Sequence, residues 1–358
     1  MTTPETDPTE TDPSETDPTP SEHTGAATAT PGTMRAVVQH AYGPPSVLST
    51  TTLPRPQIAD DEVLVRVAAA GVDRGVWHLV TGTPFAVRLA GYGVRTPKQQ
   101  VPGMDLAGTV VEVGAGVTDF AVDDEVYGIG VGTYAEFARA KANKLAHRPA
   151  TLPAEQAAAL TISGSTACQA LFDVGRAESG QRVLVLGASG GVGSFAVQLA
   201  KARGLHVTAV ASGAKRDHVL ALGADVVLDY AVDDFTEQPP FDLIIDVGGR
   251  NKLSTLRRAI TGDGTLVIVG GENGGSITGG TGRQLRAMLL SPFVSQRLTS
   301  FIAKETVDRW AQLRELVESG DVTAPVDRTY RLDEAVDALD DLEAGRVRGK
   351  AVIVVAPR

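Results

Sequence analysis

Residues 183–203 join an apolar run, a glycine-rich turn and an amphipathic segment. Residues 183–186 are continuously apolar, as in a parallel strand buried on both faces, and 194–203 carry apolar residues at helical spacing. Strand, glycine turn and helix in this order can bind a pyrophosphate, because the helix N-terminus presents N–H groups without partners. An ordinary glycine-rich loop is the alternative. The pattern predicts a dinucleotide site that includes Gly187, Gly190, Gly191, Val192 and Gly193.

Composition indicates a cytoplasmic protein of one or two domains. The chain has 358 residues, of which 42% are apolar, enough to bury more than one core. Its single cysteine, Cys168, excludes a disulfide framework and any multi-thiolate metal site. Cys168 lies in a helix-like apolar run, where we expect a packed thiol. No apolar run has membrane-spanning length and the N-terminus lacks a signal-peptide layout, so we expect no membrane association.

Residues 1–33 differ in composition from the rest of the chain. The sequence Glu-Thr-Asp-Pro recurs three times, and no Lys, Arg or aromatic residue precedes Met34. Such a segment cannot bury enough surface to offset chain entropy, so we predict a disordered acidic tail. Seven of its residues are acidic, which leaves −3 of the formal net charge of −10 for the remainder. The nearly neutral body suggests neither nucleic acid nor an anionic membrane as a partner.

The strand pattern changes along the chain. Short strands separated by Gly, Pro and Asp predict a partly open β-barrel, at residues 35–38, 62–68, 107–113 and 125–127. After about residue 155, strands alternate with helices, which predicts an α/β domain with a six-stranded, doubly wound parallel sheet. Its strands are expected at residues 183–186, 206–211, 225–230, 241–247, 264–269 and 297–302. We expect a helix at 307–319 and a strand at 351–355 to return to the first domain.

Several motifs make the chain resemble the medium-chain dehydrogenase/reductase superfamily, in its zinc-free quinone oxidoreductase branch related to zeta-crystallin. They are Ala69-Ala-Gly-Val-Asp73, Pro102-Gly-Met-Asp-Leu-Ala-Gly108, Val113-Gly-Ala-Gly-Val117, Asp124-Glu-Val-Tyr-Gly128, Ala188-Ser-Gly-Gly-Val-Gly193, Leu222-Gly-Ala-Asp225 and Arg348-Gly-Lys350. The resemblance implies a GroES-like, partly open β-barrel catalytic domain at 34–160 and 304–358. It also implies a Rossmann domain at 161–303 that binds NADPH, and a homodimer.

The resemblance bears on the metal content. Alcohol-oxidising relatives hold a catalytic zinc with a cysteine where this chain has Asp73 and a histidine where it has Met104. A thioether is a poor zinc ligand, one carboxylate cannot replace the set, and the four-cysteine zinc lobe is absent. We therefore expect no metal. Without a Lewis acid on the carbonyl oxygen, hydride addition to the β-carbon of an enone or quinone remains the accessible reaction.

The end of the second nucleotide-binding strand indicates NADPH. NAD-preferring sites carry an acid there to hold the ribose hydroxyls, whereas this chain has Ser212, Lys215 and Arg216. These residues can bind a 2′-phosphate. Lys215 and Tyr230 match positions at which related NADPH-dependent quinone reductases contact the phosphate. The alternative is that both basic residues only solvate a helix N-terminal turn.

Further cofactor contacts follow from the resemblance. Thr166 matches a residue near the nicotinamide ribose or carboxamide, with a core helix threonine as the alternative. Val247, Val269 and Gly270 end the fourth and fifth strands, where this fold opens onto ligand. Lys350 is expected either to reach the cofactor from the barrel side or to be a surface lysine.

The catalytic candidates are Asp73, Trp77 and His78. The Asp73 position is commonly Asn in relatives and lies near the nicotinamide ribose. Protonation of the α-carbon after hydride transfer needs a donor or water, and His78 has a suitable intrinsic pKa. A histidine bound to a backbone carbonyl is the alternative for His78, and Trp77 is expected to shape the pocket.

We therefore expect an NADPH-dependent oxidoreductase that reduces a small quinone or α,β-unsaturated carbonyl without zinc. The alternatives are a zinc-independent reductase resembling alcohol dehydrogenases and a non-catalytic NADPH-binding protein with a docking loop at 272–286. A short-chain dehydrogenase is excluded, because none of the six tyrosines has a lysine four residues later.

Overall fold

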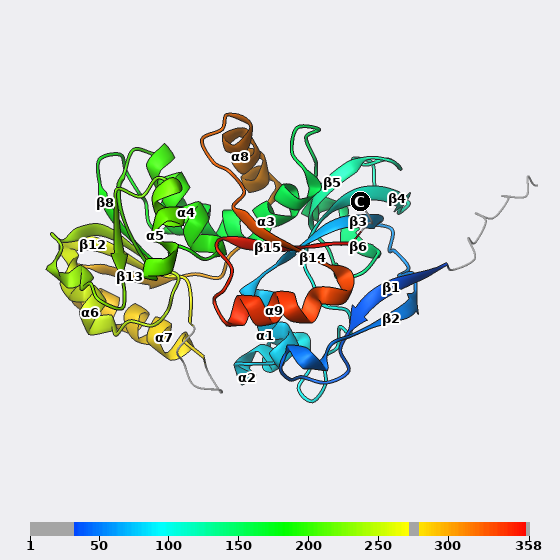
Figure 1. Ribbon diagram of the computed structural model, residues 1–358, viewed down its shortest axis with the longest axis horizontal. Helices are drawn as coiled ribbons and strands as arrows, with labels where there is room; N and C mark the ends of the chain where they lie inside the picture. Colours follow the sequence, from blue (N-terminus) through cyan, green and yellow to red (C-terminus); the bar gives the residue numbers. More distant parts are fainter. Residues whose placement is uncertain (1–31, 272–278, 356–358) are drawn as a thin grey trace, which may run out of the picture. The chain divides into compact units, whose positions relative to one another are not determined.

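The computed structural model describes residues 32–271 and 279–355 (Figure 1). The body that begins at Thr33 forms one compact unit. Within it, the described strands form a six-stranded sheet, a seven-stranded sheet and a two-stranded sheet. The predicted division into domains, with boundaries at residues 160/161 and 303/304, stays a prediction. Helix α3 (Ala154–Cys168) continues across the first of these boundaries.

The six-stranded sheet has the doubly wound order expected for nucleotide binding. Its order is β10-β9-β8-β11-β12-β13, and every neighbouring pair is parallel. The order reverses direction between β8 and β11, where this architecture opens onto ligands at the carboxyl ends of the strands. The strands are β8 (Arg182–Leu186), β9 (His206–Ala211), β10 (Val226–Asp229), β11 (Phe241–Asp246), β12 (Ile260–Ile268) and β13 (Arg297–Ser300).

The GroES-like part contains the seven-stranded sheet. Its strand order is β14-β15-β3-β4-β5-β7, and β6 also pairs with β3. The last strand, β15, pairs antiparallel with β3, so the C-terminal segment returns to this part as predicted. The strands are β3 (Glu62–Val72), β4 (Asp105–Val113), β5 (Glu125–Ile129), β6 (Phe137–Lys141), β7 (Leu145–His147), β14 (Val326–Arg331) and β15 (Lys350–Val354); β1 (Thr33–Val38) and β2 (Ser49–Pro54) pair separately.

Nine α-helices connect these strands in the described part of the chain. They are α1 (Arg74–Thr81), α2 (Phe85–Val87), α3, α4 (Gly191–Ala202), α5 (Arg216–Ala221), α6 (Leu253–Ala259), α7 (Thr281–Leu290), α8 (Val307–Glu318) and α9 (Ala335–Glu343). Short helical turns are η1 (Pro45–Val47), η2 (Arg88–Tyr92), η3 (Ala142–Lys144), η4 (Gln169–Val174), η5 (Gly213–Lys215), η6 (Phe235–Glu237), η7 (Ser291–Phe293) and η8 (Leu332–Glu334). No helix in residues 32–271 or 279–355 is both long and apolar enough to cross a membrane.

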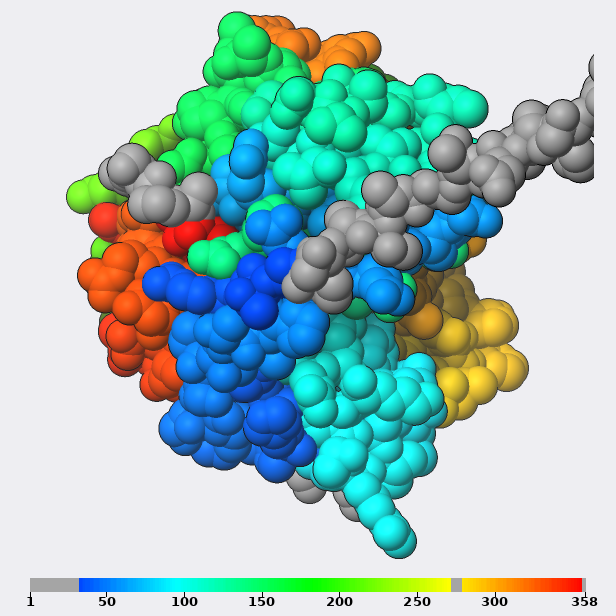
Figure 2. Space-filling view, turned by 90° about the vertical axis from the view of Figure 1, so that its right-hand side faces the viewer, coloured from blue at the N-terminus to red at the C-terminus, as the bar shows by residue number. Residues whose placement is uncertain are grey.

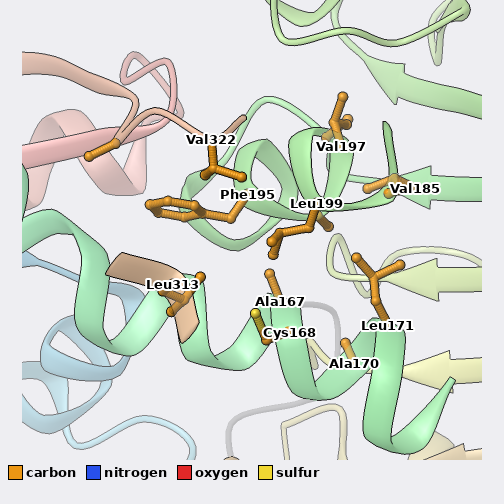
Figure 3. Packing of buried hydrophobic residues seen from close by; sticks show 14 of the residues in the cluster. Ala167, Cys168, Ala170, Leu171, Val185, Phe195, Val197, Leu199, Leu313 and Val322 are labelled. Carbon is orange, nitrogen blue, oxygen red and sulfur yellow. The ribbon is translucent and has the colours of Figure 1, made fainter. Parts of the chain in front are cut away.

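Helix α3 is the buried link between the two large sheets. It packs against α4 of the nucleotide-binding part and against β3 and β4. Phe195 of α4 and Leu313 of α8 lie in the same core as Cys168 at the end of α3 (Figure 3). Burial raises the pKa of the Cys168 thiol to about 12, which agrees with the predicted packed thiol.

The structure corrects several predicted boundaries. β1 begins at Thr33, so the last residue of the predicted tail belongs to a strand, while residues 1–31 lie outside the described part. Helix α4 begins at Gly191 instead of 194, because the glycine turn itself provides the first helical turn. β12 begins at Ile260, and β2, β6, β7 and β14 were not predicted. These four strands are short or polar, so they lack a clear alternation of apolar residues.

The segment after α1 folds back onto the residues that follow β1. The Tyr42 hydroxyl donates to the carbonyl oxygen of Gly93 at 2.7 Å, and the Arg88 guanidinium lies 4.4 Å from the Tyr42 ring centroid. In the space-filling view the two segments lie side by side, in cyan and blue (Figure 2). The loop after α1 is therefore held by contacts with Tyr42, in the loop between β1 and β2.

Candidate active site

The glycine turn joins the carboxyl end of β8 to the N-terminus of α4, as predicted. Gly187 has a φ of +81°, a conformation that favours glycine. A Cβ on Gly193 would lie 2.2 Å from the Gly187 carbonyl oxygen, so the helix can approach the turn only without a side chain there. Gly190 is the N-cap, and the first N–H groups of α4 have no partner within the helix. The turn therefore has the backbone required to hold a pyrophosphate.

The segment before β15 lies against this turn. The Gly349 N–H donates to the carbonyl oxygen of Ser189 at 2.8 Å, and Gly349 pairs with Gly190 in a short parallel bridge. The next residue, Lys350, passes beneath the turn: a Cβ on Gly191 would lie 3.0 Å from its Cδ. The C-terminal strand thus brings a lysine of the GroES-like part to the first turn of α4.

Lys350 is buried, which excludes the predicted alternative of a surface lysine. Its side chain is 1% exposed, its Nζ donates to Asp73 Oδ1, and the same Nζ lies 3.6 Å from Asp105 Oδ2. Asp73 follows β3 at the N-cap position of α1, where its side chain makes no capping hydrogen bond, while Asp105 begins β4. The ammonium therefore joins the ends of two neighbouring strands beneath the nucleotide turn.

Asp73 is an ionised member of this cluster. Burial by itself raises the pKa of the Asp73 carboxyl, but the Lys350 ammonium and hydrogen bonds to the carboxylate outweigh burial and lower that pKa. One of these bonds comes from the hydroxyl of Ser163 on α3, at 3.1 Å from Oδ1. The predicted catalytic residue Asp73 thus holds Lys350 and α3 in place.

Asp105 was not among the predicted site residues. It is fully buried; its Oδ1 accepts hydrogen bonds from the Thr161 hydroxyl and from the Ile162 N–H at 3.3 Å. Burial and the neighbouring Asp73 carboxylate raise the pKa of Asp105 well above its ordinary value, against the opposing effect of Lys350. In the sequence, the only indication of Asp105 is a single acidic residue at the start of an apolar strand, in the same motif as Met104.

The residues predicted to read the 2′-phosphate follow β9. Lys215 donates to the carbonyl oxygen of Val347 at 2.6 Å, and Arg216 donates to that of Val227 at 2.9 Å. Burial lowers the pKa of Lys215; the nearby Arg348 acts in the same direction. Ser212 precedes Lys215 as the N-cap of η5.

Tyr230 lies beside these residues. Its N–H donates to the carbonyl oxygen of Ala211 at 3.2 Å, which places the end of β10 beside the end of β9. The Tyr230 residue is 63% exposed. Tyr230, Ser212 and Lys215 are thus brought to one edge of the sheet.

The ends of β11 and β12 meet at the same sheet edge. Val247 follows β11, and Val269 and Gly270 follow β12, next to the fully buried Asp246. Arg283 of α7 donates to Asp246 Oδ2 at 2.5 Å and to the carbonyl oxygen of Gly270 at 3.2 Å. Burial raises the pKa of Asp246, and the Arg283 guanidinium lowers it only in part.

Arg283 lies in the segment that was predicted as a docking loop. Of that segment, residues 272–278 lie outside the described part, whereas 281–286 form the first turns of α7. Arg283 was not among the predicted site residues, because no local pattern pairs an arginine with an aspartate 37 residues earlier.

Three further predicted site residues form hydrogen bonds with neighbouring groups of the protein. Thr166 donates to the carbonyl oxygen of Ile162 at 2.8 Å, one turn earlier in α3. The Trp77 indole N–H donates to Glu343 of α9 at 3.2 Å. Trp77 can therefore contact a ligand through its ring but does not have its N–H available. The Nδ1 of His78 lies 2.5 Å from the carbonyl oxygen of Thr83, which makes Nδ1 the protonated nitrogen and matches the backbone-bound alternative.

In residues 32–271 and 279–355, no three histidine, cysteine, aspartate or glutamate side chains are grouped so as to hold a metal ion. Asp73 and Met104, the positions of two zinc ligands in relatives, lie in different surroundings. Asp73 is paired with Lys350, and Met104 packs against the apolar core of the GroES-like part.

Family models match both parts of the chain. Residues 59–150 match the model described as the alcohol dehydrogenase GroES-like domain, and residues 222–353 match the model described as zinc-binding dehydrogenase. The matches follow the order of the GroES-like sheet and the nucleotide-binding sheet in the chain.

Individual relatives extend over most of the chain. The 2-methylene-furan-3-one reductase of Solanum lycopersicum is 30% identical and covers 93% of this chain, which spans 82% of that relative. The quinone oxidoreductase of Rattus norvegicus is 31% identical, with 90% of this chain and 98% of the relative covered. A mycobacterial protein solved in complex with NADPH superposes with a TM-score of 0.77 at 28% identity, covering 90% of this chain and 99% of that one.

Proposed function

Because the chain belongs to the medium-chain dehydrogenase/reductase superfamily, in its quinone oxidoreductase branch, we propose that it reduces a quinone or an α,β-unsaturated carbonyl with NADPH. The observation that carries the proposal is the glycine turn at the N-terminus of α4, with the buried Lys350 beneath it. Two similar proteins are named as a quinone oxidoreductase and a furanone reductase, which supports the same chemistry here.

The residues present fit a dinucleotide. Without a side chain on Gly193, α4 approaches the turn closely, and the first N–H groups of this helix, at Gly191, Val192 and Gly193, can hold a pyrophosphate. When bound, the reduced nicotinamide supplies a hydride. Thr166, Val247, Val269 and Gly270 would hold the nicotinamide end, since the strands β11 and β12 end there.

NADPH is favoured over NADH by the charges after β9. Lys215 and Arg216 supply positive charge, and Ser212 supplies a hydroxyl, where an NAD site carries an acid. Tyr230 is exposed beside them and is free to turn toward a phosphate. An ammonium binds a phosphate through charge-assisted hydrogen bonds. Lys215 is therefore the residue that we expect to distinguish NADPH from NADH.

The proposed chemistry needs no metal. The Asp73 carboxylate is already neutralised by Lys350, and a thioether such as that of Met104 is a poor zinc ligand. Hydride addition to the β-carbon moves charge onto an oxygen that donors can hold. His78 would give the α-carbon its proton only as an imidazolium, because the carbonyl of Thr83 occupies its Nδ1–H.

Oligomeric state is part of the proposal. β13 lies at the edge of the six-stranded sheet, and the side chains near it include the exposed Leu289, Phe293 and Ile302. An open edge beside exposed apolar residues supports a homodimer. Sedimentation equilibrium of the full chain tests this, and a monomer at micromolar concentration contradicts it.

Activity is tested by following NADPH oxidation with a panel of simple quinones, enones and saturated ketones. We expect turnover with quinones or enones and little with saturated ketones. NADPH binding without turnover of any acceptor would contradict the enzymatic proposal.

A further inference from the structure

Two carboxylate oxygens beneath the nucleotide turn have no hydrogen-bond partner among the described residues. They are Asp73 Oδ2 and Asp105 Oδ2, both buried. The space is tight, since a Cβ on Gly71 would lie 2.7 Å from Asp105 Oδ2. Two buried acceptors without donors are costly, because each has lost its hydrogen bonds to water.

The charges of the cluster do not balance if both carboxyls are ionised. Within residues 32–271 and 279–355, Lys350 is the one ammonium in contact with the pair, at Asp73 Oδ1 and at 3.6 Å from Asp105 Oδ2. The neighbours of Asp105 are Asp73 just after β3, Lys350 from β15, the hydroxyl of Thr161 and the Ile162 N–H from α3, and Ile129 opposite on β5. The nearby phenol of Tyr134 is occupied by the Gly71 carbonyl, at 3.2 Å, and burial raises its pKa.

We propose that Asp73 and Asp105 share one proton, carried by Asp105, and that through this proton Asp105 positions Lys350 beneath the cofactor turn. One proton between the two carboxyls gives each orphaned oxygen a partner. It also makes the cluster neutral, with one ammonium and one carboxylate. The two carboxyls are within hydrogen-bonding reach of each other, and that bond lowers the pKa of Asp73 while raising that of Asp105.

The link to the cofactor runs through Gly191. Lys350 Cδ lies beside this residue, since a Cβ on Gly191 would be 3.0 Å away, so the lysine side chain packs against the first turn of α4. Ionisation of Asp105 would leave a net negative charge under the turn that binds an anionic pyrophosphate. The cofactor part of this inference rests on the proposed function, whereas the shared proton does not.

The direction of the pH dependence follows from the raised pKa of Asp105. The folded protein holds the proton at a pH where the unfolded chain has lost it. The stability contributed by Asp105 is therefore complete below its ordinary pKa of about 3.9 and is lost as the pH rises toward the folded pKa. In that window the unfolding equilibrium constant rises by up to about tenfold per pH unit.

Asp105→Asn tests the proton without any substrate. The amide imitates a protonated carboxyl and cannot ionise, so the variant should gain stability relative to the wild type as the pH rises from about 5 to about 9. Asp60→Asn, at an exposed aspartate, is the matched control and should show no such trend. An infrared band of a protonated carboxylic acid at neutral pH should be present in the wild type and missing in Asp105→Asn. The inference would be overturned if the difference in stability between Asp105→Asn and the wild type did not change with pH and the wild type showed no such infrared band.

A double variant tests the charge balance. Asp73→Asn leaves Asp105 free to ionise and pair with Lys350, so each single variant keeps one carboxylate. Asp73→Asn/Asp105→Asn leaves a buried ammonium without a counterion, and its midpoint of urea unfolding should fall by far more than the sum of the singles. Additive effects would contradict a shared proton.

The positioning role has its own readout. The Kd of NADPH for the wild type should rise between about pH 7 and about pH 9 more than that of Asp105→Asn. If the Kd of NADPH depends on pH equally in both proteins while the carboxyl proton is confirmed, the positioning role of Asp105 is wrong and the shared proton still stands. Absence of any NADPH binding would instead count against the proposed function.

Discussion

The Nζ of Lys215 donates to the backbone carbonyl of Val347 at 2.6 Å, so the lysine proposed to read a 2′-phosphate is bonded to the segment that leads into β15. The same segment carries Gly349 and Lys350 against the glycine turn. Lys215 and the glycine turn are therefore both bonded to the segment that precedes β15.

Lys215→Ala should raise the Kd of NADPH at least about tenfold and leave that of NADH nearly unchanged. A charge-assisted hydrogen bond contributes about 1.5–3 kcal/mol, and 1.4 kcal/mol is about tenfold in affinity. Fluorescence titration with both cofactors measures this. Lys201→Ala, at a lysine paired with Asp225 on the same part of the chain, is the control and should alter neither affinity. Equal losses for both cofactors would show that Lys215 does not read the phosphate.

Lys350→Met should lower the free energy of unfolding by about 3 kcal/mol, because it leaves the buried Asp73 carboxylate without its cation. Urea denaturation at neutral pH measures the change. Lys141→Met removes a lysine from an exposed ion pair with Asp61 and should leave the midpoint nearly unchanged. Similar effects of both substitutions would mean that the buried pair contributes no more than a surface one.

Arg283→Met should destabilise the protein increasingly as the pH rises. The pKa of Asp246 is already raised by burial, and loss of the guanidinium raises it further. The stability contributed by the protonated carboxyl is present at low pH and is lost as the pH rises through the folded pKa. Thermal unfolding at about pH 5 and about pH 8 measures the trend. Asp246→Asn/Arg283→Met, which removes the buried charge, should recover most of the loss at the higher pH; failure to recover would assign the defect to α7 packing.

Deuteride from labelled NADPH should appear on the β-carbon of a simple enone, with a solvent proton on the α-carbon. The charge then spreads onto the carbonyl oxygen, which donors can stabilise. NMR of the product locates the label. An allylic alcohol labelled at the former carbonyl carbon would contradict the proposed double-bond reduction.

His78→Ala should slow this reaction modestly if the imidazolium supplies the α-proton, and should not alter the position of the label. Steady-state turnover of a simple enone by the variant and the wild type measures the effect. His147→Ala, at a histidine bound to the carbonyl of Asp119, is the control. An unchanged rate would assign the proton to water.

The purified protein should contain no stoichiometric zinc, although a family model that matches it is described as zinc-binding dehydrogenase. Asp73 is committed to Lys350, and Met104 supplies only a thioether. Metal analysis and activity after chelation measure this. One zinc per chain together with loss of activity on chelation would contradict the prediction.

The sequence predicted those parts of the fold that rest on local patterns. The strand, glycine turn and helix around Gly190 were predicted because each step leaves a periodic or compositional signal. The return of the last strand to the first domain was also predicted correctly. By contrast, β14 carries polar residues along most of its length and gives no such signal.

The buried polar contacts could not be predicted in this way. Asp73 and Lys350 are 277 residues apart, and Asp246 and Arg283 are 37 apart, so no local pattern relates them. Lys350 illustrates the difficulty, because a lysine is usually exposed and burial depends on a partner supplied by the tertiary fold. Asp105 was missed for the same reason, since its role depends on Asp73 and Lys350, which are distant from it in the sequence.

The buried thiol at the end of α3 also makes the chain convenient for labelling. Cys168 is the only cysteine, and its raised pKa leaves almost no thiolate in the folded protein at neutral pH. A thiol reagent will therefore react when the core between α3 and α4 opens, and the rate of modification will report that opening. A second cysteine placed on an exposed strand end can be labelled selectively, with no need to remove the natural one.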